Sequence, residues 1–428
     1  MNPFLRLPYA AAGMVSRSLV AVAPRASSKV FRALSARRGL LDRYEAWSAV
    51  NRDPSRPLLW VHAPSVGEGL QAQPVIDRLR ARHPETQTVY TFFSPSAESF
   101  AANIGADFSD YLPFDTSGNA DRALDALLPT AIAFSKLDVW PLLTEKAAKR
   151  GVRLALISAT VPESSGRRSR FAAMALRDAY AAFDAVGAIA PEDAARLVEM
   201  GARAGRVTVT GDTRYDQVWQ RANTPSPARN VLLQHFRDDR PTLVAGSTWP
   251  ADEERLLPAW LQARRVLPAA RLIIAPHELS RTHLDAIAEW AAGASLSLSR
   301  SSERAARAAD VVLVDEYGIL GDLYALADAA YVGGGFHAAG LHSLLEPAAF
   351  GAPVILGPMH RDNRDAALLV AGGAAVRCKG PGDIAARLIA WLQHPHILEN
   401  AGGAAKKVVE NGLGAADRSA DLVEVLLR

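Results

Sequence analysis

Two short stretches of this 428-residue chain combine residue types that are suited to chemistry. Ser65-Val66-Gly67-Glu68 follows an apolar run typical of a strand and precedes a helical pattern. Gly333-Gly334-Gly335-Phe336 also follows such a run and leads into Ser343-Leu344-Leu345-Glu346-Pro347. In open α/β sheets, ligands bind outside the carboxyl ends of the strands. We therefore expect a carboxylate at one ligand edge, a glycine-rich loop and helix start at another, and an enzyme that works in the cleft between them.

Glu68 is the candidate general base. A carboxylate on a loop at the ligand edge can take a proton once it is partly desolvated. Ser65 and Glu68 also have the spacing of a helix capping box, in which the serine caps the first turn and the glutamate favours the helix dipole. On spacing alone, the capping interpretation is the stronger one.

The three consecutive glycines suit a phosphate, because backbone N–H groups and the dipole of the following helix attract anions. A tight strand-to-helix turn explains them equally well. The stretch fails as a dinucleotide fingerprint, since Gly333, Gly335 and Gly340 have the wrong last interval. Glu346 either caps its own helix together with Ser343 or accepts hydrogen bonds from ribose hydroxyls.

Polar residues also follow two other predicted strands. Asp138 lies just past the apolar run Ala131–Phe134, and His277 follows Pro276 at the end of another run. An imidazole at a ligand edge can donate a hydrogen bond to a phosphate, although a surface histidine with ordinary partners is commoner. No histidine–carboxylate cluster has metal-ligand spacing, so the sequence predicts no metal site.

Arg214 lies in a polar stretch at the end of the first expected domain. An arginine at that place can reach a phosphate or a carboxylate of a substrate across the cleft. The simpler interpretation is a solvated residue of the domain junction, paired with Asp212 or Asp216.

These residues must be positioned by the alternation of strand and helix patterns that begins at Pro57. Such alternation predicts parallel sheets with both faces covered by helices. The polar stretch Gly211–Arg240 breaks the rhythm, so we expect an N-terminal segment, residues 1–50, and two Rossmann-like domains, residues 51–220 and 221–428. The expected strands are 58–63, 88–93, 131–134, 153–157, 185–189 and 207–210 in the first domain and 242–245, 271–275, 311–314, 329–332, 353–356 and 374–376 in the second.

The N-terminal segment is basic and amphipathic, while the whole chain has a net charge of only +3. No aromatic–basic interleaving or motif indicates nucleic-acid binding. The longest uncharged run falls short of the ~20 apolar residues that a membrane span needs. A helical segment lying on an anionic membrane surface fits better, and an exposed helix pair docked on the first domain is the alternative. Its cations are Arg6, Arg17, Arg25, Lys29, Arg32, Arg37, Arg38 and Arg43.

As an ordered set, several motifs resemble those of the Kdo (3-deoxy-D-manno-octulosonic acid) transferases of glycosyltransferase family 30. The resemblance runs from about Leu58 to the C-terminus, and each motif alone is weak. The matching pieces are Trp60-Val61-His62-Ala63-Pro64-Ser65-Val66-Gly67-Glu68, Asp138-Val139-Trp140-Pro141, Thr210-Gly211-Asp212-Thr213-Arg214-Tyr215-Asp216, Gly246-Ser247-Thr248, Ala275-Pro276-His277, Asp315-Glu316-Tyr317-Gly318, Gly333-Gly334-Gly335-Phe336 and Leu345-Glu346-Pro347-Ala348-Ala349.

The resemblance implies a GT-B glycosyltransferase, with two Rossmann-like domains facing across a cleft. Such an enzyme moves Kdo from CMP-Kdo to a lipid A precursor in lipopolysaccharide biosynthesis, inverts the anomeric centre and needs neither a metal nor another cofactor. It lies monotopically on the cytoplasmic face of the inner membrane, which agrees with the basic N-terminal segment.

The resemblance also implies roles for individual residues. Glu68 would deprotonate the acceptor hydroxyl, while Asp138 and Arg214 would stabilise the transition state. The nucleotide would lie on the second domain against Pro276, His277, Tyr317, Gly318, Ile319, Ser343, Leu344, Leu345 and Glu346.

The sequence departs from the family pattern on both sides of the site. Asp138 and Arg214 stand where the family usually has glutamate and lysine. The usual Pro-Arg-His reads Pro276-His277-Glu278, and the usual Met-Gly-Glu reads Tyr317-Gly318-Ile319. Two alternatives therefore stay open: another GT-B transferase with a different sugar-nucleotide donor, or a catalytically weakened nucleotide-binding protein.

Overall fold

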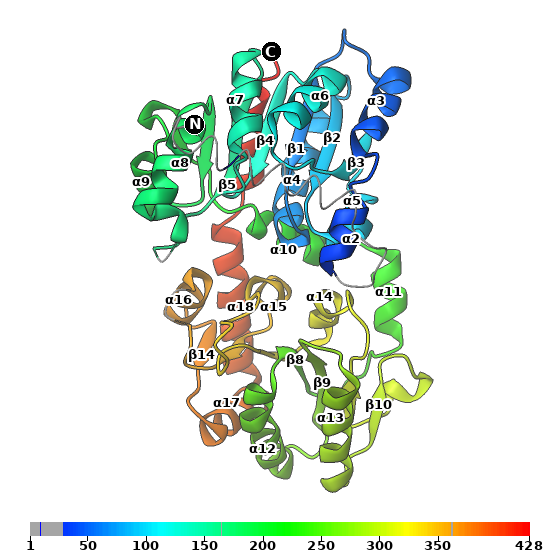
Figure 1. Cartoon of the computed structure of the whole chain (residues 1–428). Coiled ribbons are helices and arrows are strands. Elements are labelled where there is room, and N and C mark those ends of the chain that lie inside the picture. The colour runs from blue at the N-terminus through cyan, green and yellow to red at the C-terminus, as the bar shows by residue number, and fades with distance from the viewer. Residues whose placement is uncertain (1–8, 10–28, 164, 361–362) are drawn as a thin grey trace. The chain divides into compact units, whose positions relative to one another are not determined.

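The computed structural model describes Tyr9 and residues 29–163, 165–360 and 363–428. The chain divides into two compact units, Met1–Gln217 with Leu413–Arg428 and Val218–Gly412. Each unit has one parallel seven-stranded sheet with helices on both faces (Figure 1), so the two Rossmann-like domains are confirmed. The expected second domain ran to residue 428, whereas the chain returns to the first unit at Leu413.

The first sheet has the strand order β3-β2-β1-β4-β5-β6-β7. Its strands are β1 Leu58–His62, β2 Gln87–Phe92, β3 Phe108–Tyr111, β4 Ala131–Ser135, β5 Arg153–Ala159, β6 Ala185–Ala188 and β7 Val207–Val209. The helices of this unit are α2 Lys29–Ser35, α3 Leu40–Asn51, α4 Val66–Arg82, α5 Glu98–Ala101, α6 Ser117–Leu127, α7 Pro141–Lys149, α8 Arg170–Ala181, α9 Pro191–Glu199 and α19 Ala415–Glu424, while α10 Arg214–Asn223 crosses the boundary.

The second sheet has the order β10-β11-β9-β8-β12-β13-β14. Its strands are β8 Thr242–Thr248, β9 Arg271–Pro276, β10 Leu298–Arg300, β11 Val311–Leu313, β12 Ala329–Val332, β13 Val354–Leu356 and β14 Ala375–Arg377. Its helices are α11 Pro227–Gln234, α12 Pro250–Val266, α13 Arg281–Gly293, α14 Leu320–Leu323, α15 Leu345–Phe350, α16 Arg364–Ala371, α17 Pro381–Gln393 and α18 Pro395–Asn411.

Most of the strands that the sequence predicted are buried. The central strands are buried along their whole length and mostly apolar, as is typical of parallel strands covered on both faces. The sequence prediction missed β3 and β10, which lie at the edges of their sheets and are only partly buried. Polar residues interrupt their apolar runs, so neither has the pattern of a buried strand.

Each sheet has a topological switch point, where the strand order reverses direction. It lies between β1 and β4 in the first unit and between β8 and β12 in the second. Ligands of doubly wound folds bind in the crevice outside the strand ends at such a point. Glu68 follows β1, Asp138 follows β4, and the three glycines follow β12. The switch points therefore gather the residues singled out from the sequence.

The C-terminal helix α19 packs against α4 and the strands β5 and β6. The carboxylate of Asp216 on α10 accepts hydrogen bonds from the backbone N–H groups of Gly414 and Ala416, at 2.8 and 2.9 Å. These are donors that the first turn of a helix cannot satisfy internally. Asp216 thereby caps α19 on the first unit.

Part of the expected membrane segment is docked on the first unit. Helix α3 buries Leu40, Leu41 and Tyr44, and the Tyr44 hydroxyl donates to the carbonyl of Tyr111 at 2.8 Å. The expectations for residues 1–8 and 10–28 lie outside the described residues. None of the described helices combines the length and apolar character that a membrane span requires.

Arg37, one of the cations of that segment, is only 5% exposed. Its guanidinium lies 4.3 Å from the ring centroid of Phe93 and donates to the carbonyls of Ala33, Phe93 and Leu112. Burial lowers the pKa of Arg37 to about 10, so the side chain is still charged at neutral pH. This arginine therefore binds groups inside the first unit and is not available to a membrane surface.

We expect Arg37→Met to lower the free energy of unfolding of the first unit by about 3 kcal/mol, because one buried and two partly buried carbonyls lose their donor. Urea unfolding followed by circular dichroism measures this loss. The control is Arg32→Met, whose cation is exposed and pairs with Glu98 at 3.4 Å; it should change stability by less than about 0.5 kcal/mol. Equal effects of the two substitutions would contradict an interior role for Arg37.

Candidate active site

Glu68 lies in the first turn of α4, directly after β1. Its carboxylate accepts a hydrogen bond from the Ser65 hydroxyl and forms an ion pair with Lys136, with Nζ 2.9 Å from Oε1. Ser65 is the N-cap residue, yet its side chain caps no helix N–H group. The capping-box interpretation of this pair is therefore wrong, because the serine binds the glutamate side chain.

Lys136 has a φ of +57°, in the left-handed region that non-glycine residues rarely adopt. Its backbone N–H donates to the carbonyl of Ile157 at 2.9 Å, which helps to fix this conformation. Strain of this kind costs about 1–3 kcal/mol and is concentrated at functional sites. Here it accompanies the ion pair between Lys136 and Glu68.

Asp138 binds three side chains. Its Oδ2 accepts from Trp140 Nε1 at 3.0 Å and lies 2.8 Å from His62 Nε2, while Oδ1 is 3.6 Å from Arg167. Burial on its own would raise the pKa of Asp138. The hydrogen bond and charge of His62, the Trp140 N–H and the Arg167 charge outweigh burial, so the pKa is lowered overall. The structure therefore presents a second carboxylate that stays ionised.

The loop after β4 connects these two carboxylates. It carries Asp138 itself, it supplies Lys136 to Glu68, and the Ser135 hydroxyl donates to the Glu68 carbonyl at 3.3 Å. Two of the three predicted catalytic residues thus share one switch point.

Arg214, the third, is the first residue of α10. Its Nε and Nη2 donate to Oδ2 of Asp212 at 2.9 and 2.7 Å, as the simpler interpretation of the sequence expected. The neighbouring Thr213 hydroxyl donates to the carbonyl of Gln71 at 2.7 Å. Gln71 belongs to α4, the helix that carries Glu68. Thr213, the residue before Arg214, is therefore hydrogen-bonded to that helix.

In the second unit, the glycine-rich loop is organised by Asp252, a fully buried residue of α12. Its carboxylate accepts from the N–H groups of Gly334 at 2.7 Å and Phe336 at 3.2 Å. The expected phosphate cradle is wrong for these two groups, since an internal carboxylate already binds them. A Cβ on Gly333 would lie 2.1 Å from the carbonyl oxygen of Ser247, so a close backbone approach explains this glycine.

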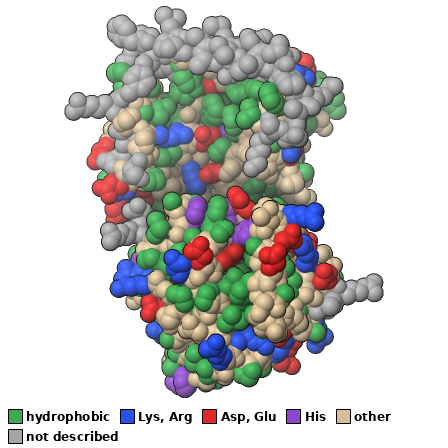
Figure 2. All heavy atoms as spheres, turned by 60° about the horizontal axis from the view of Figure 1, so that its bottom comes forward, with side chains coloured by type: hydrophobic (Ala, Val, Ile, Leu, Met, Phe, Trp, Pro, Cys, Tyr) green, Lys and Arg blue, Asp and Glu red, His purple; other side chains and the backbone are tan. Residues whose placement is uncertain are grey.

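Trp249, directly after β8, stacks with histidines of two other loops. Its ring centroid is 4.1 Å from that of His337 and 4.5 Å from that of His277. Trp249 Nε1 donates to His342 Nε2 at 3.2 Å, so that nitrogen carries no proton. Burial and the neighbouring His277 lower the pKa of His342. Figure 2 shows histidine side chains grouped beside acidic ones on one face.

The structure brings further predicted nucleotide residues to the same sheet edge. Pro276 ends β9, and the His277 N–H donates to the carbonyl of Thr248 at 2.9 Å. The sequence Tyr317-Gly318-Ile319 follows the adjacent strand β11 and precedes α14. Tyr317 is 75% exposed, and its phenol oxygen accepts from the N–H of Leu279 at 3.3 Å.

The sequence Ser343-Leu344-Leu345-Glu346 precedes and begins α15. Leu344 is the N-cap residue, so the predicted cap by Ser343 is wrong. Burial raises the pKa of Glu346; Arg221 partly offsets this, and the like charge of Asp322 adds to it. Glu346 is thus a carboxylate whose charge is costly to hold in the free protein.

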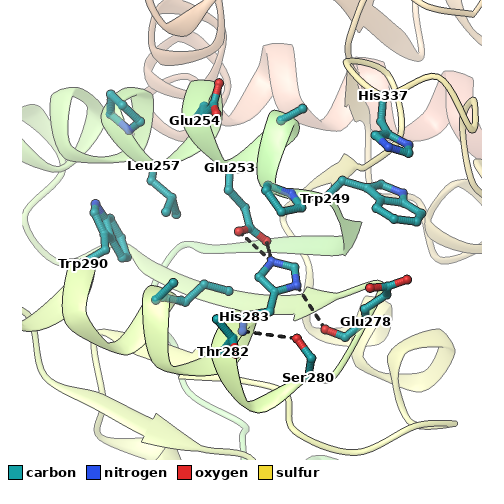
Figure 3. A pocket seen from close by; sticks show the side chains of 15 residues that line it. Trp249, Glu253, Glu254, Leu257, Glu278, Ser280, Thr282, His283, Trp290 and His337 are labelled. Atoms are coloured by element: carbon teal, nitrogen blue, oxygen red, sulfur yellow. Dashed lines mark hydrogen bonds and ion pairs between the residues drawn. The ribbon is translucent and has the colours of Figure 1, made fainter.

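The second unit also has a cavity of about 890 Å³ that α12 and α13 line. Figure 3 shows the His283 ring pointing at the Glu253 carboxylate, with Nε2 to oxygen distances of 2.9 and 3.0 Å. Glu254 and Glu278 add negative charge, and Trp290 supplies an apolar wall. These carboxylates disfavour a phosphate inside the cavity, although Trp249 and His337 of the stacked rings at the strand ends also line it.

Sequence reasoning did not single out His62, Arg167, Trp249 or Asp252 as site residues. His62 ends β1 and Trp249 follows β8, so their position beside a switch point was an available signal. Arg167 and Asp252 have no such signal, because only the tertiary structure brings them to their partners. Within the described ranges, no group of three or more His, Cys, Asp or Glu residues could hold a metal ion.

Comparisons with known proteins give the family context. Residues 32–217 match the family model described as 3-deoxy-D-manno-octulosonic-acid transferase (kdotransferase). The 3-deoxy-D-manno-octulosonic acid transferase of Bordetella pertussis is 32% identical over 381 residues, which cover 86% of each chain. The protein of that name from Haemophilus influenzae is 26% identical over 401 residues, or 91% of this chain and 92% of the relative.

Among solved structures, the UDP-GlcNAc 2-epimerase of Neisseria meningitidis, bound to UDP-GlcNAc, matches with a TM-score of 0.61. The match covers 87% of this chain and 99% of that chain at 16% sequence identity. Because the identity is so low, this likeness supports the fold alone.

We expect Glu346→Gln to raise the melting temperature at about pH 8 and to have no such effect near pH 4. Below the usual glutamate pKa of about 4.3, both the folded and the unfolded chain hold the proton. As the pH rises through the raised folded pKa, the folded protein must keep a buried charge, which costs stability. Glutamine removes that cost.

Thermal unfolding across this pH range measures the effect. The control is Glu410→Gln, an exposed residue of the same unit that pairs with Lys407 at 3.4 Å. A gain in melting temperature that is independent of pH would contradict a destabilising charge on Glu346.

Proposed function

The chain belongs to the 3-deoxy-D-manno-octulosonic acid (Kdo) transferase family and is therefore a glycosyltransferase, and we propose that it transfers Kdo from CMP-Kdo to a lipid A precursor with inversion and without a metal ion. The observation that carries this proposal is the pair of carboxylates at the switch point of the first sheet, each held by a cationic or N–H partner. It supplies a base and a fixed negative charge, which the reaction needs.

Glu68 is the proposed general base. The acceptor hydroxyl attacks the anomeric carbon, its proton passes to Glu68, and the bond to phosphate breaks with its electron pair leaving on CMP. The ion pair with Lys136 and the Ser65 hydrogen bond fix the carboxylate before the acceptor arrives. Such preorganisation lowers the cost of orienting the base during reaction.

Asp138 and Arg214 are the proposed transition-state partners. Positive charge grows on the sugar ring as the bond to phosphate breaks, and the ionised Asp138 can stabilise it. Arg214 can neutralise the departing phosphate, while Asp212 holds its guanidinium ready.

The donor is proposed to bind the second unit at the ends of β8, β9, β11 and β12. Imidazole and indole rings there offer stacking surfaces and N–H donors, and Glu346 offers an acceptor for ribose hydroxyls. A glycosyltransferase with a different sugar nucleotide is the remaining alternative, since the nucleotide motifs depart from the family pattern. Turnover assays with CMP-Kdo and with other sugar nucleotides, on a lipid A precursor, decide between the two donors.

The protein is also proposed to lie peripherally on the anionic cytoplasmic face of the inner membrane. Support comes from the sequence of residues 1–28, where basic and apolar residues alternate without an acidic one. Arg37 of the same expected segment is buried in the first unit and is therefore left out of the proposed membrane-binding cations.

We expect Glu68→Gln to lower kcat/KM for Kdo transfer about 10²- to 10⁴-fold, because glutamine has nearly the same shape but cannot take the acceptor proton. The KM for CMP-Kdo should stay near the wild-type value. Initial rates with CMP-Kdo and a lipid A precursor measure both. Glu85→Gln, an exposed substitution in the same unit, is the control. Turnover of Glu68→Gln within about tenfold of wild type would sink the proposed role.

Reversing Arg6, Arg17 and Arg25 to glutamate should weaken binding to anionic vesicles by about 100-fold or more, since each basic residue near such a surface contributes about 1 kcal/mol. Sedimentation with vesicles of neutral and anionic lipid measures the partitioning. The control reverses three exposed arginines elsewhere, Arg255, Arg281 and Arg428, which gives the same net charge. Equal partitioning of the two triple variants would contradict an N-terminal membrane site.

A further inference from the structure

His62 is fully buried at the end of β1, and both of its ring nitrogens face oxygen atoms. Nε2 lies 2.8 Å from Asp138 Oδ2, and Nδ1 lies 3.0 Å from the carbonyl oxygen of Thr91. A carbonyl oxygen can only accept a hydrogen bond, so Nδ1 must carry a proton. The proton on Nδ1 of His62 is therefore held by the backbone of the neighbouring strand.

The Thr91 hydroxyl does not change this assignment. It accepts from Trp60 Nε1 at 2.9 Å, and its own proton can reach the carbonyl of Val61 at 3.5 Å. If it donated to Nδ1 instead, two lone pairs would face each other across the 3.0 Å contact between that nitrogen and the Thr91 carbonyl. Only a protonated Nδ1 satisfies the hydrogen bonding of Nδ1 itself, the Thr91 carbonyl, the Thr91 hydroxyl and the Trp60 N–H.

The state of Nε2 then depends on Asp138. The Asp138 carboxylate also accepts from Trp140 and has Arg167 3.6 Å from its other oxygen, which favours the ionised form. An ionised carboxylate can only accept, so Nε2 must donate to it. With both nitrogens donating, the ring is an imidazolium, and the pair is a buried charge-assisted contact.

No other described ring or charge displaces this arrangement. The remaining neighbours of the His62 ring are the rings of Phe134 and Trp140, at centroid distances of 6.2 and 6.3 Å. The charged and titratable groups that face the pair are Arg167, Tyr9 and Tyr180, through their electrostatic interaction with Asp138. Tyr9 is itself bound to Asp115, with a distance of 2.8 Å between the oxygens.

We propose that His62 is a positioning residue of the transfer reaction, which keeps its proton throughout turnover, holds Asp138 ionised and presents Oδ1 of Asp138 to the reacting sugar. This inference rests on the proposed function, because it assigns Asp138 to the growing positive charge. A buried cation behind the carboxylate preserves the negative charge of Asp138 when an anionic donor approaches. Orienting partners of this kind commonly change activity by one or two orders of magnitude.

The protonation state is tested first, without any substrate. Nitrogen-15 NMR of the full-length enzyme, labelled at histidine, should show a hydrogen on both ring nitrogens of His62 at about pH 7.5, with the signal assigned by its loss in His62→Gln. In Asp138→Asn, the same ring should carry one hydrogen only. A neutral His62 in the wild-type protein, or an imidazolium that survives Asp138→Asn, would overturn the inference.

Kinetics then test the role. His62→Gln keeps an N–H donor but has no charge, so kcat should fall about 100-fold while the KM for CMP-Kdo changes by less than about threefold. The acidic limb of the kcat–pH profile should move to higher pH, because Asp138 loses the cation that favours its ionisation. The double variant with Asp138→Asn should be no slower than Asp138→Asn alone, since His62 acts through Asp138.

A matched control comes from the second unit, where His283 lies between the Glu253 carboxylate and the Glu278 carbonyl in a similar arrangement. His283→Gln should leave the acidic limb unchanged. A loss of activity in His62→Gln with an unmoved acidic limb would reduce His62 to a structural residue and overturn the proposal. Failure of the wild-type enzyme to use CMP-Kdo would reject the proposed function instead. The NMR experiment would still decide the protonation state of His62, because it needs no substrate.

Discussion

Where a parallel strand ends, the chain leaves the sheet and its last backbone groups need new hydrogen-bond partners. Both units meet this constraint with ionisable side chains at their switch points. The carbonyl of Thr91 in β2 lies 3.0 Å from Nδ1 of His62 in β1, and Nε2 of His62 in turn binds the carboxylate after β4. In the second unit, Asp252 binds two backbone N–H groups of the loop after β12. The reactive edges of the sheets are thus built from groups that also complete the fold.

The fold was largely predictable because the central parallel strands are mostly apolar runs that are buried along their length. That signal is local, so the sequence shows it for strands such as β1 and β9. Polar residues interrupt the short runs of the edge strands β3 and β10, which explains why both were missed, whereas the edge strands β7 and β14 were predicted. The return of α19 to the first unit depends on Asp216, which lies far from it in sequence. No local pattern records such a contact.

The site was predictable only in part, because the sequence shows local patterns but not contacts between distant residues. Glu68 and Asp138 could be placed at a ligand edge, because position after a strand is a local property. Their partners could not be assigned: Ser65 matched a helix cap by spacing but binds the Glu68 carboxylate. Likewise, the glycine-rich loop resembled a phosphate cradle until Asp252 proved to bind its amides. Composition was equally ambiguous for Arg37, since a cation in an amphipathic segment can face a membrane or an aromatic cage.

The counter-ions of the two carboxylates differ in a way that matches their proposed roles. Lys136, beside Glu68, has a side chain that is 35% exposed and a strained backbone, so water or a substrate can replace its ion pair. His62, beside Asp138, has a side chain with no exposure and is bound at both nitrogens, so water cannot replace it as a partner. A general base must change its protonation state in every cycle, whereas a carboxylate that stabilises positive charge must not. An exchangeable partner for the first and a fixed partner for the second therefore fit the chemistry proposed for each carboxylate.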